Sequence, residues 1–224
     1  MRKRRDNHRR RDAFTLIDLL IVISLVAVAM IGILLLRPTS THRSHAPRIT
    51  CVNNLRQIGV GFHVWANDHN DHFPMELSKT NGGTMESAAE GTAVPHLCVL
   101  SNELSSQFDT PKVFLCPADK GRTPATSFST GITWSNISYF VGVDSSITNS
   151  EMLLSGDHNI TNGTAARKGL LTLTTNEPAG WTHELHQLQG NAGLADGSVQ
   201  QFVSARLREQ ITHAVGITNR LAMP

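Results

Sequence analysis

The chain contains 224 residues, of which 40% are hydrophobic, and its formal net charge at pH 7 is +2. This size and composition suit one folded domain, or one domain with an appendage. Seven basic residues lie within residues 1–12, whereas 13 basic and 15 acidic residues follow residue 36. Because the basic stretch holds no Phe, Tyr or Trp and the rest of the chain has no basic surplus, the sequence argues against a nucleic-acid partner.

Residues 14–36 form an apolar run that is interrupted only by Thr15, Asp18, Ser24 and Gly32. A helix of this length extends over roughly 35 Å, which exceeds a bilayer hydrocarbon core of about 30 Å. The run therefore predicts a membrane-spanning helix. Because basic residues flank the cytoplasmic ends of such helices, we expect the amino terminus in the cytoplasm and the remainder outside it.

Asp18 is the unusual residue of this run, because a carboxylate in a bilayer is costly and calls for a partner. The alternative is a position near the lipid headgroups, where the charge is tolerated. The stretch Arg-Asp-Ala-Phe-Thr-Leu-Ile-Asp-Leu-Leu, residues 11–20, resembles the prepilin leader of type IV pilins and type II secretion pseudopilins. This resemblance implies that a prepilin peptidase cuts between Ala13 and Phe14 and that the new terminal Phe14 is N-methylated.

The same resemblance implies a mode of assembly, in which the α-amine of Phe14 in one subunit neutralises the Asp18 carboxylate of a neighbour. The implied partners are other pilin-like subunits in a homo- or hetero-fibre, the prepilin peptidase/N-methyltransferase and the inner-membrane assembly platform. The chain departs from the family pattern in having Ala13 in place of Gly and Asp18 in place of Glu. Signal-peptidase cleavage after residues 27–29 is an alternative, but the apolar run continues to Leu36.

Apolar residues recur every three or four positions from residue 49 to residue 65 and predict an amphipathic helix of about four to five turns. Pro38 and Pro47 are expected to bend or interrupt a helix that passes through them. Together with the apolar run, this predicts an α+β, pilin-like fold: one long kinked helix has a membrane-spanning lower half and packs its upper half on a small antiparallel sheet. The predicted domains are a basic leader (1–13), a transmembrane helix (14–36), a connector with the upper half of the helix (37–67) and an extracytoplasmic α+β head (68–224).

The head is expected to contain several short strands. The clearest local pattern is at residues 190–202, where Asp196-Gly197 separates two strand-like segments and predicts a hairpin with a two-residue type I′ turn. Ser204 is expected to cap a closing helix over residues 205–215, with Gly216 as its stop. Further strands are predicted at residues 112–116, 139–143, 152–155 and 170–175.

A second resemblance comes from three blocks: Cys-Val-Asn-Asn-Leu-Arg-Gln-Ile-Gly at residues 51–59, Cys-Pro-Ala-Asp at residues 116–119, and a His followed after nine residues by Asp-Gly. Together they resemble an uncharacterised head domain that is attached to prepilin helices. This resemblance implies a pilin-like, sheet-bearing head and no established biochemical activity. The motif residues are Asn53, Asn54, Leu55, Gln57, Gly59, Cys116, Pro117, Asp119, His186, Asp196 and Gly197.

The three cysteines, Cys51, Cys98 and Cys116, leave at least one thiol unpaired within the chain. In an exported head one disulfide is reasonable, and Cys51 with Cys116 is the candidate pair. Buried free thiols are the alternative.

The densest group of metal-ligand residue types consists of His63, His69 and His72 with Asp68 and Asp71. Imidazole and carboxylate suit zinc, and carboxylates alone suit calcium. However, the spacing matches no compact zinc motif, and a polar run after a helix favours a loop that ends the helix. We therefore predict no metal and no cofactor.

His186 and Asp196, and the pairs at residues 157–158 and 183–184, are the candidate catalytic groups. No Gly-x-Ser-x-Gly elbow, phosphate-binding loop or paired-cysteine metal knuckle accompanies them in the sequence. Structural hydrogen bonding is therefore the favoured role, and we predict that the chain is not an enzyme.

The sequence as a whole predicts a structural pilin-like subunit of a type II secretion or type IV pilus-like system. The predicted location is a single pass through the inner membrane with a periplasmic or other extracytoplasmic head, or a place in an extracellular fibre. Two alternatives remain open: a non-polymerising, membrane-anchored binding protein, and an anchored metal-dependent hydrolase that uses the cluster from His63 to His72.

Overall fold

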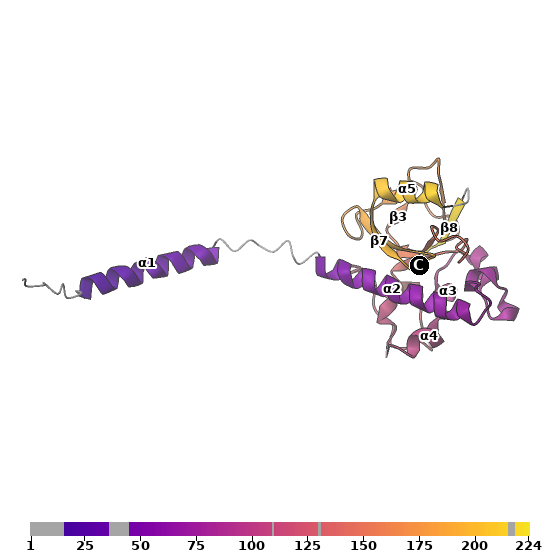
Figure 1. Ribbon diagram of the computed structural model, residues 1–224, viewed down its shortest axis with the longest axis horizontal. Helices are drawn as coiled ribbons and strands as arrows, with labels where there is room; N and C mark the ends of the chain where they lie inside the picture. The colour runs from indigo at the N-terminus through magenta and orange to yellow at the C-terminus, as the bar shows by residue number, and fades with distance from the viewer. Residues whose placement is uncertain (1–15, 36–44, 109, 130, 215–217) are drawn as a thin grey trace, which may run out of the picture. The chain divides into compact units, whose positions relative to one another are not determined.

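A computed structural model describes residues 16–35, 45–108, 110–129, 131–214 and 218–224. The chain divides into two compact units, Met1–Thr41 and His42–Pro224. The first unit contains helix α1 (Leu16–Leu35), and the second contains every other described element (Figure 1).

The second unit is built on an antiparallel sheet of six strands in the order β4-β8-β1-β2-β6-β7. A separate antiparallel pair joins β3 to β5. The strands are β1 (Tyr139–Gly142), β2 (Leu153–Asp157), β3 (Ile160–Thr161), β4 (Leu170–Thr174), β5 (Gly180–Trp181), β6 (Gln189–Leu194), β7 (Val199–Val203) and β8 (Thr218–Ala222).

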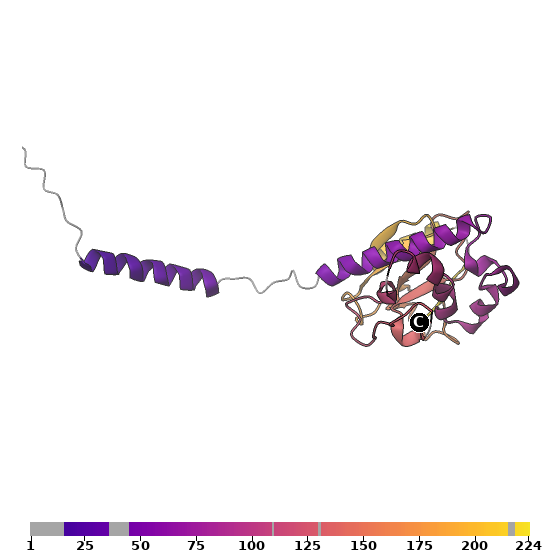
Figure 2. The same ribbon diagram turned by 90° about the horizontal axis from the view of Figure 1, so that it is seen from below.

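Helices cover both faces of the six-stranded sheet. Helix α2 (His45–Asn67) contacts β6, β2 and β7, and Figures 1 and 2 show it running across one face. Helix α5 (Ser204–His213) packs on the opposite face through Leu207 and Ile211. Side chains in β1 and β2 alternate between these two cores, which explains why both strands are buried along their whole length.

Short helices fill the side of the unit next to α2. They contribute the buried side chains Leu97, Leu104 and Phe114 to the core that α2 shares with the sheet, and Phe73, which directly precedes η2, joins them there. These helices are η2 (Pro74–Glu76), η3 (Lys79–Asn81), η4 (Met85–Glu90), α3 (Val94–Cys98), α4 (Ser101–Ser105), η5 (Pro111–Phe114) and η6 (Trp134–Asn136).

The structure is α+β with an antiparallel sheet, but the predicted pilin-like fold is wrong. That fold requires one long helix whose upper half packs on the sheet, whereas α1 and α2 are separate helices that belong to different compact units. The predicted membrane-spanning lower half also fails: among the described residues, no helix combines the length and the apolar character needed to cross a membrane.

Local predictions had mixed outcomes around the helices. The periodic segment at residues 49–65 is helical as predicted, and Pro47 lies in the first turn of α2, where its missing N–H group costs no helical hydrogen bond.

Two other local predictions are wrong. The predicted strand at residues 112–116 is not formed, because residues 111–114 form η5. Ser204 is not a cap: its hydroxyl accepts a hydrogen bond from the Trp181 amide at 3.2 Å. Pro38 and Gly216 lie outside the described residues.

The predicted hairpin at residues 190–202 is confirmed by the pairing of β6 with β7. Its turn is not type I′, because only Gly197 has a positive φ, +83°, and Asp196 does not. The Gly197 amide donates to the Leu194 carbonyl at 3.0 Å, and the Ser198 amide donates to the Asp196 carboxylate at 2.8 Å. These contacts describe a type I turn followed by a left-handed glycine, which is the usual three-residue hairpin loop.

Candidate functional site: a buried disulfide, imidazole and carboxylate cluster

Cys51 and Cys116 form a disulfide in the interior of the second unit. Cys51 lies in α2 and Cys116 follows η5, and both side chains are fully buried. The bond thus joins α2 to a segment 65 residues further along the chain. Cys98 is left as a free thiol.

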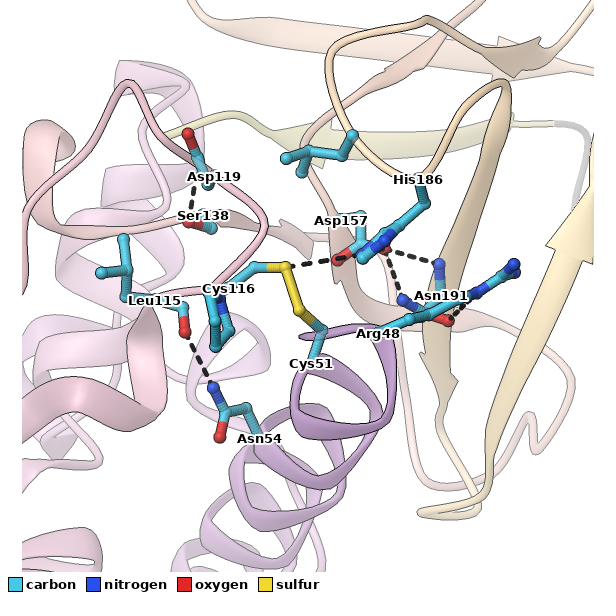
Figure 3. Close-up of a disulfide and its surroundings, with 12 residues drawn as sticks. Arg48, Cys51, Asn54, Leu115, Cys116, Asp119, Ser138, Asp157, His186 and Asn191 are labelled. Atoms are coloured by element: carbon cyan, nitrogen blue, oxygen red, sulfur yellow. Dashed lines mark hydrogen bonds and ion pairs between the residues drawn. A yellow bond between two sulfur atoms is a disulfide. The ribbon is translucent and has the colours of Figure 1, made fainter. Parts of the chain in front are cut away.

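His186 lies against this disulfide in a tight turn that precedes β6. His186, Gln187 and Leu188 have consecutive positive φ values of 51°, 55° and 61°, a conformation that L-residues adopt at a cost. The turn directs the imidazole inward, so that its Nε2 lies 3.4 Å from the Cys116 Sγ and 3.4 Å from the Asp157 Oδ2 (Figure 3).

Asp157 is the last residue of β2 and is fully buried. Its Oδ2 accepts hydrogen bonds from the backbone N–H of Asn191 at 2.7 Å and from the Asn191 side chain at 2.8 Å. Its Oδ1 is buried and has no hydrogen-bond partner among the described residues. The β2–β6 register that pairs Gly156 with Ala192 brings the two side chains together.

Burial dominates the electrostatics of the cluster. It raises the pKa of Asp157 to about 7, although the Asn191 hydrogen bonds and the positive charge of Arg48 oppose the rise. Burial also lowers the pKa of His186 to about 4, and Arg48 adds to that effect. The imidazole is therefore neutral at physiological pH, and its contact with Asp157 is not a pair of opposite charges.

Arg48, in the first turn of α2, brings a positive charge to the edge of the cluster. Its Nε donates to the Asn191 Oδ1 at 3.3 Å, and its Nη1 donates to the Gln189 side chain. Asn191 therefore bonds to the carboxylate of Asp157 on one side and to the guanidinium on the other (Figure 3).

Asn54 connects the predicted motif in α2 to the Cys116 segment. Its side-chain nitrogen donates to the Leu115 carbonyl at 2.8 Å and to the Tyr139 hydroxyl at 3.3 Å. A buried amide with two such bonds fixes the position of the residue next to Cys116. The structure thus gives Asn54 a structural role beside the disulfide.

Asp119 forms a second polar group that is nearer the surface. Its Oδ2 accepts hydrogen bonds from Ser138 at 2.8 Å and from His158 at 3.0 Å, and it lies 3.2 Å from the Nε of Arg122. Burial raises the pKa of Asp119, but these bonds and the charges of His158 and Arg122 outweigh burial and lower it overall. The group lines an open pocket of about 430 Å³ that also includes Trp134 and Glu184.

His186 and Asp196 do not share a site, because they lie at opposite ends of β6. The nine-residue spacing between them reflects a left-handed turn, one extended strand and the start of the next turn. At the far end of β6, Gly197 packs on α2 beside Gly59, with 3.8 Å between the Gly197 Cα and a Cβ built at Gly59. The Asp-Gly part of the motif therefore shapes a hairpin and its contact with α2.

The remaining predicted motif residues have separate positions. Leu55 is buried in the core, Asn53 is exposed, and Gln57 and Pro117 line a surface pocket on the α2 side. Asp18 is an exposed residue in the first turn of α1. The predicted processing residues Ala13 and Phe14 lie outside the described residues.

The histidines from residue 63 to residue 72 are not gathered into one site. His63 packs edge-on against Phe73, and His69 stacks on Trp65 with ring centroids 3.6 Å apart. His72 is exposed and lies 3.8 Å from Glu76. Within the described part of the chain, the one group of three or more metal-ligand residue types consists of Cys51, Cys116, Asp157 and His186.

Sequence reasoning did not connect Asp157, Asn191 or Arg48 with the disulfide. The available signal was Asp157 itself, a carboxylate that directly follows the apolar segment at residues 152–155. In the disulfide form the cluster is a covalent link between α2 and the Cys116 segment. In a reduced form it would place two thiols beside an imidazole and a carboxylate.

Comparison with family models, curated proteins and solved structures finds no match to this chain. The resemblances to prepilin leaders and to the uncharacterised head domain therefore depend on the motif residues alone.

Proposed function

We propose that this chain is a structural subunit of a type IV pilus-like or type II secretion pseudopilus-like fibre and that it assembles through its N-terminal helix. The observation that supports this proposal is the surface of α1. Twelve large apolar side chains between Leu16 and Ile31 are each 51% to 76% exposed.

A helix that is apolar on every side is normally covered. Burying one such side chain contributes about 1.5–3 kcal/mol, so covering even part of α1 favours association strongly. We assign the covering role to the equivalent helices of other copies or of related subunits. Assembly of this kind leaves the second unit free to fold around its own core.

The prepilin-like motif completes the proposal. Cleavage between Ala13 and Phe14 by a prepilin peptidase/N-methyltransferase would release an α-amine, which would pair with Asp18 of a neighbouring subunit. The assembly platform and the inner-membrane location belong to the same proposal. The Cys51–Cys116 disulfide supports an exported head, because such bonds persist mainly in oxidising compartments.

A second candidate function is binding by the head, which the pocket at Asp119 favours. Arg122 lies over the Trp134 ring at 5.8 Å, and this pair borders a pocket that also holds His158 and Glu184. This cation–π contact holds an indole that is 64% exposed at the edge of the pocket, where it could contact a ligand. The proposed hydrolase at residues 63–72 has no such support, because its histidines point to different neighbours.

Site-directed crosslinking tests the assembly proposal. In a Cys98→Ser background, which keeps the Cys51–Cys116 disulfide, one added unpaired cysteine at position 22 (Val22→Cys) should form intermolecular disulfides between α1 helices at low protein concentration. The matched control is Val203→Cys in β7, because Val22 and Val203 are similarly exposed, at 51% and 45%. Equal and weak crosslinking of the two variants in the native host would contradict assembly through α1.

A further inference from the structure

We propose that Cys51, Cys116, Asp157 and His186 form a zinc site when the disulfide is reduced. Each residue offers one ligand atom, and these four atoms all lie within 4.8 Å of one another. They come from four places in the chain: α2, the segment after η5, the end of β2 and the turn before β6. Folding of the second unit thus brings together four ligands that belong to no single local sequence motif.

The ligand chemistry suits zinc. Two thiolates, one imidazole and one carboxylate are established tetrahedral zinc ligands, with bonds of about 2.3 Å to sulfur and about 2.0–2.2 Å to nitrogen or oxygen. Those bond lengths place neighbouring ligand atoms about 3.3–3.8 Å apart. The observed separation of 3.4 Å from the His186 Nε2 to the Cys116 Sγ falls in that range. The same Nε2 lies 3.4 Å from the Oδ2 of Asp157, so the carboxylate whose Oδ1 would bind the ion is adjacent to the imidazole. Reduction would allow the two sulfur atoms to separate.

Asp157 supplies an independent observation. The residue is fully buried, and its Oδ1 has no hydrogen-bond partner among the described residues. A buried polar atom without a partner is costly, and a metal ion would satisfy it. Two hydrogen bonds from Asn191 hold the other oxygen, as is usual for a carboxylate that ligates a metal.

The charge balance of the site also fits a divalent ion. Two thiolates and one carboxylate around Zn²⁺ leave one negative charge when the imidazole is neutral. Arg48, whose positive charge acts on Asp157, would offset it. The guanidinium is held in place by Asn191 and Gln189.

Zinc would bind after the disulfide is reduced and would be released when the disulfide forms again, and both changes proceed by thiol–disulfide exchange. A dithiol reductant would transfer two electrons and two protons to the Cys51–Cys116 bond, yielding two thiols and an oxidised reductant. Zinc would then displace both thiol protons into solvent. Exchange with a disulfide oxidant would re-form the bond and release the ion, so the disulfide and the zinc site exclude each other.

The test uses the full chain with Cys98→Ser, so that only the two cluster thiols remain after reduction with a phosphine. Competition with a chromophoric chelator should show one Zn²⁺ per reduced chain and none per oxidised chain. His186→Gln and Asp157→Asn should each weaken Zn²⁺ binding by at least about tenfold. The control variants His69→Gln and Asp68→Asn, at residues outside the cluster, should bind as the parent does. No zinc on the reduced parent, or unchanged affinity in both cluster variants, would overturn the proposal.

A spectroscopic measurement on the parent chain does not depend on the folding of any variant. Co²⁺ bound to the reduced chain should show thiolate-to-cobalt charge transfer together with the intense visible bands of a tetrahedral site. Weak octahedral bands without charge transfer would overturn the proposal. Zn²⁺ should also raise the midpoint of thermal unfolding of the reduced parent and leave that of the Cys51→Ser variant unchanged.

Discussion

The two long helices have nearly the same length, 20 residues in α1 and 23 in α2, but they bury their apolar residues differently. In α2 the stripe at residues 51, 55, 58, 62 and 65 is at most 3% exposed, because it packs on the sheet and on the short helices. In α1 the large apolar side chains from Leu16 to Ile31 are each more than half exposed. The comparison shows that α2 is part of the core of its own unit, whereas under the proposed function the apolar surface of α1 is covered by the helices of neighbouring subunits.

Truncating one apolar side chain in each helix gives the largest expected contrast. Phe62→Ala in α2 should lower the free energy of unfolding of the second unit by about 3–5 kcal/mol, because a fully buried ring leaves a cavity. Leu20→Ala in α1, which is 57% exposed, should change it by less than about 0.5 kcal/mol. Tryptophan fluorescence in denaturant measures this, since all three tryptophans lie in the second unit. A comparable loss of unfolding free energy in both variants would contradict the conclusion that the two helices bury their apolar residues differently.

The disulfide should contribute the next largest effect. Replacing Cys51 and Cys116 together by Ala should lower the free energy of unfolding by about 2–4 kcal/mol, because the bond constrains a long loop in the unfolded chain. Cys98→Ala is the matched control and should lower the free energy of unfolding by a clearly smaller amount. Chemical unfolding of the oxidised proteins compares them. An unchanged stability in the double variant would show that the cluster holds α2 in place without its covalent bond.

The stability of the head should also depend on pH through His96, which is fully buried and hydrogen-bonded to Thr84 at 2.7 Å. Burial lowers its pKa to about 4. The unfolded imidazole titrates near pH 6.5, so the unfolded state binds the proton first as the pH falls. The contribution of His96 to the free energy of unfolding should therefore decrease by about 2 kcal/mol as the pH falls from 6.5 to 5.

His96→Gln should remove this part of the pH dependence, whereas His69→Gln, which changes a histidine that is not fully buried, should keep it. Urea unfolding at a series of pH values gives the comparison. If the free energy of unfolding had the same pH dependence in the parent chain and in His96→Gln, His96 would not be the source of this part of it.

The smallest expected effect is at the hairpin that packs on α2. Gly197 has a φ of +83°, and a Cβ built there lies 3.3 Å from the His63 Nε2, so Gly197→Ala should cost about 1 kcal/mol. Gly121→Ala is the control, because the nearest atom to its added Cβ is 3.7 Å away. Thermal unfolding midpoints of the two variants measure the difference. Equal midpoints would mean that the turn relaxes without cost.

Local patterns predicted much of the second unit. The spacing of apolar residues predicted α2, and Asp196-Gly197 predicted the β6–β7 hairpin. The strand β8 was not predicted, because its polar Asn219 and Arg220 become strand residues only through pairing with β4. The segment at residues 112–116 was predicted as a strand because short apolar runs are ambiguous, and Pro111 instead begins a short helix.

The candidate site was only partly predictable for a similar reason. Cys51, Cys116 and His186 stand out in the sequence as unusual residue types. Asp157 and Asn191 join them only through the β2–β6 register, which one sequence does not show. The division of the predicted long helix into α1 and α2 was also not predictable, because apolar spacing indicates which segments are helical but not which compact unit each helix belongs to.

The central claim is that this chain enters a fibre through a processed N-terminal helix, and the mass of its mature amino terminus tests that claim most directly. Chains recovered from the crosslinked Val22→Cys fraction should begin at Phe14 and carry an added methyl group. Crosslinked chains that still begin at Met1, or that begin at Met30, would contradict the claim.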